Sequence, residues 1–326
     1  IAENAHITLP YHKLLDQIED KFRGKGSLGT TGRGIGATYA DKFNRIGIRA
    51  VDFLDDDIFK EKLEIALELK NYLFREYYKA EILNTNKIYD EYWQVRNTIS
   101  KMVKNTSLYL SDEIENGKHV LAEGAQGTFL DIDFGTYPYV TASNSIAGGA
   151  CTGLGISPKK ITRIIGVAKA YTTRVGMGPF PTELKGEEGD NLRTIGNEYG
   201  ATTGRPRRCG WFDSLLVRFA CKVNGLDEVI ITKLDVLSGL KKLKIGIAYE
   251  YNEYIYKNYT FNSKIFSQCN VIYKEVDGWQ EDIRTIGQYR HLPVNAKKYI
   301  EKIEELIEVP ITKISVGSSR LQTISR

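Results

Sequence analysis

The sequence predicts an α/β fold in which a mainly parallel central sheet is flanked by helices, with a small antiparallel excursion. Strand-length apolar runs rich in β-branched residues recur at HVLAEGAQG, ITRIIGVAKAYTTRVG, EVIITKLDVL and ITKISVG. Helical patterns lie between these runs, at residues 211–225 and 295–308. Because strands that alternate with helices favour parallel pairing, we expect ligands to bind at the carboxyl ends of the strands.

The N-terminal third is predicted to be helical after a short strand at residues 6–9. The helix expected at residues 59–83 carries apolar side chains at the i, i+3, i+4, i+7 spacing of a buried face. This stripe comprises Phe59, Leu63, Ala66, Leu67, Leu73, Phe74 and Tyr77. Residues 86–116 continue in the same style and predict a second long helix, so both segments are interpreted as core.

Residues 241–261 alternate between polar and apolar side chains, which predicts an antiparallel hairpin or meander added to the sheet. No repeat, low-complexity tract or linker divides the chain, so we expect a single domain over residues 1–326. The chain begins without Met inside the strand expected at residues 6–9. We therefore expect it to be a fragment that lacks the N-terminal part of its domain.

Composition excludes several classes of protein. There are 45 Lys+Arg against 41 Asp+Glu, and this net charge of +4 argues against nucleic acid as a partner. The apolar runs are too short to span a membrane, and the N-terminus does not resemble a signal peptide. The cysteines have neither zinc-site nor disulfide-framework spacing, so we expect reduced thiols in a cytoplasmic protein.

The loop GKGSLGTTGRGIG, at residues 24–36, has the composition of an anion site. Glycines allow successive backbone N–H groups to converge, Thr30 and Thr31 add hydroxyl donors, and Arg33 or Arg45 can supply charge. We expect the loop to hold a phosphate monoester, although it is not a G-x-x-x-x-G-K-[ST] phosphate loop. The alternative is a flexible surface loop that is basic by chance.

A second polar loop, at residues 123–145, contains an amide and a hydroxyl suited to a nucleotide. Gln126 can donate to a carbonyl oxygen and accept from a ring N–H at once, which suits a purine edge. Thr141 is a candidate phosphate donor. Asp131 and Asp133 flank Ile132 among large apolar residues, so we interpret them as satisfied structural carboxylates and assign them no chemistry.

The third loop, YGATTGRPRRCGW at residues 199–211, combines threonines with Arg205, Arg207 and Arg208. Forked guanidiniums beside hydroxyl donors suit the carboxylates or phosphates of a small substrate. The alternative is a basic patch for a phosphodiester backbone. Because the loop offers few aromatic side chains on which bases could stack and lies at a strand–helix boundary, a small anion is the better fit.

The last polar segments follow the strands at residues 228–232 and 311–315. The carboxylate of Asp235 can accept from the ring N1–H and the exocyclic amine of guanine together, and the stem of Lys233 can lie against the base. The alternative for Asp235 is a turn former or helix cap. In ISVGSSR, Ser315 offers a hydroxyl and Gly317 a bare backbone for the other side of a base, unless the segment is only a strand-end turn.

Together these segments resemble the adenylosuccinate synthetase family. The stretches that carry the resemblance are GTTGRGIG, EGAQGT-LDID-GTYPYVT, TRVG-GPFPTEL, GATTGRPRRCGW-D and TKLDVL, in order and at similar spacing. The resemblance implies a fold like that of the P-loop GTPases. It also implies GTP-dependent ligation of L-aspartate to IMP through a 6-phosphoryl-IMP intermediate, giving adenylosuccinate in the first committed step of AMP synthesis.

The resemblance further implies ligands for individual residues. IMP would be bound by Thr31, Arg45, Gln126, Thr141 and Arg205, with Gln126 positioning the purine 6-oxygen and Arg45 reaching the site of the partner subunit in a homodimer. Aspartate would be bound by Ala201, Thr202, Thr203, Gly204, Arg205 and Arg207. GTP would be bound by Arg207, Lys233, Leu234, Asp235, Ser315, Val316 and Gly317.

The catalytic base, the catalytic acid and the Mg²⁺ ligands of the family lie in an N-terminal G-D-E-G-K-G-K loop and a later His that this chain does not contain. His6 and His12 are not expected to replace that His. The chain alone is therefore expected to be inactive, and the alternative function is that of a non-catalytic nucleotide-binding remnant. A second departure is Ser318 and Ser319, where the family usually has Pro and Asp, and this change is expected to loosen the guanine contact.

Overall fold

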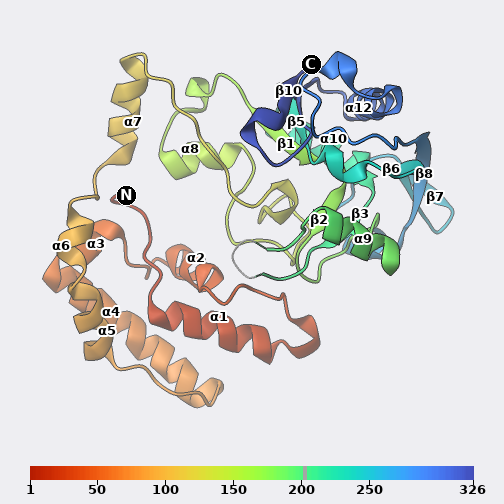
Figure 1. Ribbon diagram of the computed structural model, residues 1–326. Helices are drawn as coiled ribbons and strands as arrows, with labels where there is room; N and C mark the ends of the chain where they lie inside the picture. Colours follow the sequence, from red (N-terminus) through yellow and green to blue (C-terminus); the bar gives the residue numbers. More distant parts are fainter. Residues whose placement is uncertain (201–203) are drawn as a thin grey trace. The chain divides into compact units, whose positions relative to one another are not determined.

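The computed structural model describes residues 1–200 and 204–326, which divide into two compact units (Figure 1). The first unit comprises Ile1–Gly127, Asp131–Asp133 and Val140–Pro158, and the second comprises Thr128–Leu130, Phe134–Tyr139 and Lys159–Arg326. The residues Ala201, Thr202 and Thr203, which the resemblance implies for aspartate binding, lie outside the described residues. The expectation of a single domain stays a prediction.

The first unit is helical. Its helices are α1 (Pro10–Phe22), α2 (Ile35–Asn44), α3 (Ala50–Leu54), α4 (Asp56–Tyr72), α5 (Thr85–Trp93), α6 (Arg96–Ser100), α7 (Thr106–Glu115) and α8 (Gly148–Leu154). Pro10 begins α1, where its missing N–H costs no hydrogen bond. The strand expected at residues 6–9 is wrong, because the segment makes only an isolated bridge between His6 and Arg49.

The core of this unit contains most of the predicted stripe. Phe59, Leu63, Ala66, Leu67 and Phe74 are buried, as expected. Tyr77 is instead 60 % exposed, because a π turn at Leu73–Tyr77 follows α4 and adds a residue to the helical repeat. Tyr78 packs against the core in its place.

Residues 86–116 do not form one long helix. They form α5, α6 and α7, and the Asn105 side chain caps α7 by accepting a hydrogen bond from Leu108 N at 3.1 Å.

The strand expected at HVLAEGAQG is also wrong. Among the described residues, no strand pairs with residues 118–127, and Leu121 is 89 % exposed.

The second unit contains the predicted sheet. Its strands, in the order β1-β5-β9-β10, are β1 (Ile165–Lys169), β5 (Glu228–Thr232), β9 (Ile311–Ser315) and β10 (Thr323–Ser325). The first three are parallel and β10 is antiparallel to β9. The helices of this unit are α9 (Glu187–Ile195), α10 (Ser214–Asn224), α11 (Ser263–Gln268) and α12 (Val294–Ile307). Tyr299 of α12 is fully buried and donates to Ala170 O at 2.6 Å, which ties this helix to the end of β1.

The antiparallel excursion is also confirmed. It consists of β6 (Lys242–Tyr251) paired with β7 (Tyr254–Tyr256) and β8 (Asn270–Asp277), and β4 (Phe212–Asp213) lies parallel to β6. The β6–β7 turn places Asn252 and Glu253 at positive φ, as a two-residue hairpin turn requires. A separate ribbon pairs β2 (Thr172–Arg174) with β3 (Arg208–Gly210).

Asp213 gives the second unit a predictable dependence of stability on pH. It is fully buried at the start of α10, where it accepts from Leu216 N at 3.2 Å and from the Tyr249 hydroxyl at 2.7 Å. Burial outweighs these bonds and raises the pKa of Asp213 from 3.8 to about 6. The folded state therefore binds a proton more readily than the unfolded state, so this contribution is greatest below pH ~4 and is lost as pH rises through about 6.

We expect the parent protein to lose about 1 kcal/mol of unfolding free energy to this group between about pH 5 and about pH 7. Asp213→Asn keeps a capping oxygen but cannot titrate, so it should lack this loss. Urea unfolding of both proteins at the two pH values measures the difference. An equal pH dependence in both would contradict the assignment.

Candidate functional site

The carboxyl ends of three parallel strands meet at one edge of the main sheet. Lys169 at the end of β1 is in register with Thr232 at the end of β5, and β5 pairs in parallel with β9, which ends at Ser315. The segments after β5 and β9 are two of the polar segments singled out in the sequence. The predicted parallel pairing is therefore confirmed for β1, β5 and β9.

After β5 the chain turns sharply to present Asp235. Lys233 has a left-handed φ of 60°, and a 3₁₀ turn at Leu234–Leu237 follows it. Leu234 is fully buried and anchors the turn to the core. The Asp235 side chain is half-buried and accepts no hydrogen bond from another described residue, while burial raises its pKa. A carboxylate whose acceptor positions are not used by other described residues is suited to accepting N–H groups from a ligand.

The turn after β9 follows the strand that pairs with β5, at the same edge of the sheet. Ser315 Oγ donates to Gly317 O at 2.7 Å, so its oxygen remains available as an acceptor for an N–H group. Val316 is fully buried and its N–H donates to Gln322 O at 2.8 Å. At Gly317, a Cβ would lie 2.4 Å from the end of the Gln322 side chain, so a larger residue would require that side chain to move.

The turn that contains Ser318 and Ser319 is held by side-chain hydrogen bonds. Ser319 Oγ accepts from Leu321 N at 3.3 Å, and Ser319 N donates to Gln322 Oε1 at 2.9 Å, which forms a capping box around a 3₁₀ turn at Arg320–Gln322. Gln322 also donates to Arg284 O at 2.9 Å. Side-chain hydrogen bonds thus support the turn at Ser318 and Ser319, and the expected loosening of the guanine contact stays a prediction.

The arginine-rich loop is closed at its base. Gly200 N donates to Arg205 O at 2.8 Å, and Gly204, at a φ of 64°, donates back to Gly200 O at 2.7 Å. Arg207 N donates to Glu198 O at 2.9 Å. Arg205 and Arg207 are both half-buried. Arg205 and Arg207 therefore lie at the base of the loop, where backbone hydrogen bonds hold its two ends together.

Arg208 differs from its two neighbours because its guanidinium is used internally. It makes a forked pair with Glu183, at 2.7 and 2.6 Å, and donates to Gly178 O at 2.7 Å. The grouping of Arg208 with the anion-binding arginines was therefore wrong, since none of its nitrogens is left without a partner. Sequence spacing could not separate Arg208 from Arg205 and Arg207.

Glu198 joins several of these residues, although no sequence pattern indicates it. It is fully buried, and its carboxylate accepts from Lys169 at 2.7 Å, from Arg207 at 2.6 Å and from the Tyr171 hydroxyl at 2.6 Å. Lys233 Nζ lies 3.3 Å from Oε1 of Glu198, the oxygen that also accepts from Tyr171. Burial alone would raise the pKa of Glu198, but these bonds lower it to about 2. A single Glu between Asn197 and Tyr199 gives no pattern from which this role could be predicted.

The glycine-rich loop of the first unit is held by two carboxylates of α1. Asp16 accepts from Gly34 N at 2.9 Å, and Asp20 accepts from Leu28 N at 2.8 Å. Burial opposes a lower pKa at Asp20, but hydrogen bonds from Leu28 N and its neighbours prevail and lower it. With Gly29 N bonded to Ser27 Oγ and Gly32 N to Thr30 Oγ1, several of the loop amides are already paired, whereas the Thr31 side chain is exposed.

Arg45 ends α2 in a left-handed conformation with φ of 65°, and its side chain is exposed. Gln126 is likewise exposed at a φ of 64°. Thr141 is half-buried. The structure therefore leaves the side chains of Arg45 and Gln126 accessible, as binding residues must be.

Asp131 has the structural role expected of it. It is fully buried and accepts from Ser145 N at 2.6 Å, Ile146 N at 3.1 Å and Asp133 N at 2.9 Å. His12 is also structural. It accepts from Leu9 N at 2.9 Å and contacts the buried Asp41 at 3.1 Å through its other ring nitrogen. Neither group is presented to a ligand.

Comparison with known proteins gives the family. The family model described as Adenylosuccinate synthetase matches residues 1–324. The chain belongs to the adenylosuccinate synthetase family. The function of this family is the GTP-dependent ligation of IMP and aspartate, and the chain is accordingly a ligase. The expectation that the chain alone is inactive is not supported, because the match extends over nearly all of its residues.

Individual relatives support the assignment. The adenylosuccinate synthetase of Carboxydothermus hydrogenoformans is 51 % identical over 324 residues, which cover 99 % of this chain and 76 % of the relative. That of Halothermothrix orenii is 49 % identical over 326 residues, 100 % of this chain and 76 % of the relative. The solved structure of fully ligated adenylosuccinate synthetase from Plasmodium falciparum has a TM-score of 0.94 at 37 % identity, covering 100 % of this chain and 77 % of that chain.

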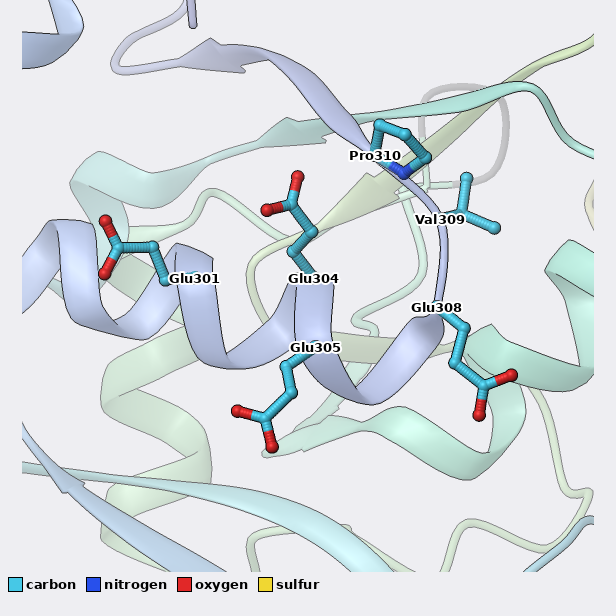
Figure 2. Close-up of a pocket in the computed structure, with 6 residues that line it drawn as sticks. All are labelled: Glu301, Glu304, Glu305, Glu308, Val309 and Pro310. Carbon is cyan, nitrogen blue, oxygen red and sulfur yellow. The ribbon is translucent and has the colours of Figure 1, made fainter.

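A hollow of about 470 Å³ lies beside α12, and none of the residues that line it is among the site residues expected from the sequence (Figure 2). It is lined by Glu301, Glu304, Glu305 and Glu308, whose carboxylates point away from one another in the figure. Glu304 pairs with Arg326 at 2.6 Å and Glu305 with Lys302 at 2.6 Å. Across residues 1–200 and 204–326, no three His, Cys, Asp or Glu side chains are placed to hold a metal ion.

The described part of the chain also contains no helix with both the length and the apolar character needed to cross a membrane.

Proposed function

We propose that this chain performs its ligation through a guanine site and an aspartate site in the second unit and through the IMP-binding residues Thr31, Arg45, Gln126, Thr141 and Arg205. The observation that carries the proposal is Asp235, a half-buried carboxylate at the carboxyl end of β5 that accepts no hydrogen bond from another described residue. Guanine presents two adjacent N–H donors to such a carboxylate, whereas adenine does not. This chemistry explains the use of GTP.

The guanine site would consist of two turns at the same edge of the sheet. Asp235 would accept from the base, Lys233 would pack its stem on the ring, and Ser315 would accept from a base N–H through its remaining lone pairs. Leu234 and Val316 are buried supports for these turns, and Gly317 would offer its bare backbone to the other side of the base. Arg207 would contact the nucleotide from the neighbouring loop.

The aspartate site would be the arginine-rich loop. Arg205 provides a planar fork that matches a carboxylate, and Gly204 lets the backbone approach it. Ala201, Thr202 and Thr203 complete the proposed clamp, although they lie outside the described residues. Arg207 would contribute charge on the side facing the nucleotide.

For IMP, we propose that Thr31 and Thr141 donate to the 5′-phosphate, that Arg205 also contacts this nucleotide, and that the exposed Arg45 reaches the phosphate of the partner subunit in a homodimer. Gln126 would hold the purine edge by its amide.

The four cysteines are free thiols, which is consistent with a cytoplasmic enzyme. Both compact units would act as one synthetase domain.

The proposed chemistry has two steps. The 6-oxygen of IMP attacks the γ-phosphorus of GTP, releasing GDP and leaving 6-phosphoryl-IMP. The amine of aspartate then attacks C6, and the C6–O bond breaks to release phosphate and adenylosuccinate. The Gln126 amide would hold the 6-oxygen in place, and charge on the transferred group would be stabilised by preorganised donors. Mg²⁺ would accompany the phosphates of GTP and neutralise part of their charge.

Isotope transfer tests this chemistry. With IMP labelled by ¹⁸O at the 6-position, the label should leave with inorganic phosphate, because the bond to carbon breaks in the second step. Mass spectrometry of the phosphate measures it. Unlabelled phosphate beside adenylosuccinate would contradict the 6-phosphoryl intermediate, and absence of product with retained GDP binding would favour a nucleotide-binding remnant.

Mixed dimers test the role of Arg45. Arg45→Leu and Gln126→Ala should each lose most activity, because each damages every site of its own homodimer. When the two variants are mixed and allowed to exchange subunits, about a quarter of the parent activity should return, since half of the dimers regain one intact site. Continued inactivity of a mixture that contains the heterodimer, as resolved by native mass spectrometry, would sink the shared-site assignment.

A further inference from the structure

We propose that Glu198 is a positioning residue that holds Arg207 of the aspartate loop and Lys233 of the guanine turn on a single carboxylate, so that one side chain sets the affinity for both aspartate and the guanine nucleotide. This inference rests on the proposed function, because it takes those two cations as ligand contacts. Glu198 itself would touch neither substrate.

The geometry of the carboxylate supports this role. Glu198 is fully buried, and one of its oxygens accepts from Arg207 at 2.6 Å and Lys169 at 2.7 Å. The other accepts from Tyr171 at 2.6 Å and lies 3.3 Å from Lys233 Nζ. A carboxylate has about four acceptor positions, so these four groups fill it. No position remains for a substrate.

The two cations are accessible on their other sides. The side chain of Arg207 is 27 % exposed and that of Lys233 is 34 % exposed, whereas the carboxylate between them is fully shielded. Lys233 also donates to Gly196 O, two residues before Glu198, so its ammonium is fixed from two directions. Each cation can therefore meet a ligand while Glu198 holds its position.

Charge makes this arrangement dependent on Glu198. Three cations, Lys169, Arg207 and Lys233, surround one carboxylate, and like charges at this range repel when the anion between them is lost. The pKa of Glu198 is lowered to about 2, so the anion persists at every pH where the enzyme would work. Neutralising Glu198 should move Arg207 and Lys233 away from their ligands.

Glu198→Gln tests the inference, because glutamine has the same shape but lacks the charge. The matched control is Glu228→Gln, since Glu228 is also buried and pairs with Arg163 at 2.6 Å, but at the amino end of β5. The Kd for GDP is measured by calorimetry, and the KM values for aspartate and IMP by steady-state kinetics. Thermal melts of both variants accompany them.

In Glu198→Gln, the Kd for GDP and the KM for aspartate should each rise about tenfold or more, as expected when charge-assisted hydrogen bonds that position a ligand contact are lost. The KM for IMP should stay within about twofold, and Glu198→Asp should fall between the parent and Gln because the charge is kept. Glu228→Gln should leave all three constants within about twofold, even if it melts earlier.

Equal effects of the two Gln variants, or unchanged constants for either ligand in Glu198→Gln, would overturn the inference while leaving the proposed function intact. A parent protein that does not prefer GDP to ADP would overturn both. If Glu198→Gln does not fold, Arg207→Lys and Lys233→Met decide the matter. Their effects on GDP binding should be non-additive when combined, and simple additivity would reject a shared anchor.

Discussion

Replacing Asp235 with asparagine is expected to raise the KM for GTP by about a hundredfold or more, because two charge-assisted hydrogen bonds to guanine are lost. Asparagine offers one acceptor in place of two, and its NH₂ faces the donors of the base. ITP lacks the exocyclic amine and forms only one of the two bonds, so its KM should rise much less. Steady-state assays with GTP and ITP at saturating IMP and aspartate measure the two changes.

The nearby Asp282 provides a control for charge alone. Its carboxylate lies on the surface, pairs with Arg284 at 2.6 Å and contributes to the electrostatic environment of Asp235. Asp282→Asn should therefore alter the KM for GTP and the KM for ITP by the same small factor, about threefold at most. Equal weakening of GTP and ITP in Asp235→Asn would mean that this carboxylate does not read guanine.

Replacing Arg205 with lysine is expected to raise the KM for aspartate about a hundredfold, because a bidentate guanidinium–carboxylate pair is reduced to a point contact. The charge is unchanged, so the loss reports geometry and not attraction at a distance. The KM for GTP should change much less, since Arg205 is proposed to contact aspartate and IMP. Kinetics with each substrate varied in turn measure the difference.

Arg208→Lys is the control within the same loop. Arg208 is committed to Glu183 and to backbone carbonyls, so this variant should melt at a lower temperature and keep the KM for aspartate within about threefold. If Arg208→Lys raised the KM for aspartate as much as Arg205→Lys, the loop would be acting through its fold, and the assignment of Arg205 to the substrate would be wrong.

Local patterns predicted the parts of the molecule in which neighbouring residues decide the outcome. The β-branched runs that became β1, β5 and β9 alternate with helices, and this alternation is enough to predict a parallel sheet. The Asp235 turn follows from the same pattern, because a polar segment after a buried strand lies at the carboxyl edge. The buried role of Asp131 was also predictable from its large apolar neighbours.

The features that were missed depend on partners distant in sequence or on small changes of backbone. A π turn shifts the buried side chain from Tyr77 to Tyr78, and no periodic pattern announces one extra residue. The apolar run around Leu121 has strand composition, yet a strand needs a partner, and pairing is not encoded locally. Glu198 gathers cations from residues 169, 207 and 233, a set that only the fold brings together.

The most direct test is the formation of adenylosuccinate by this chain from IMP and aspartate, with GTP, ITP or ATP as the phosphoryl donor. Product, GDP and phosphate are quantified together by chromatography. The assignment predicts one GDP and one phosphate for each adenylosuccinate, with GTP far better than ITP and ATP ineffective. Equal product with ATP, or GTP hydrolysis without adenylosuccinate, would contradict it.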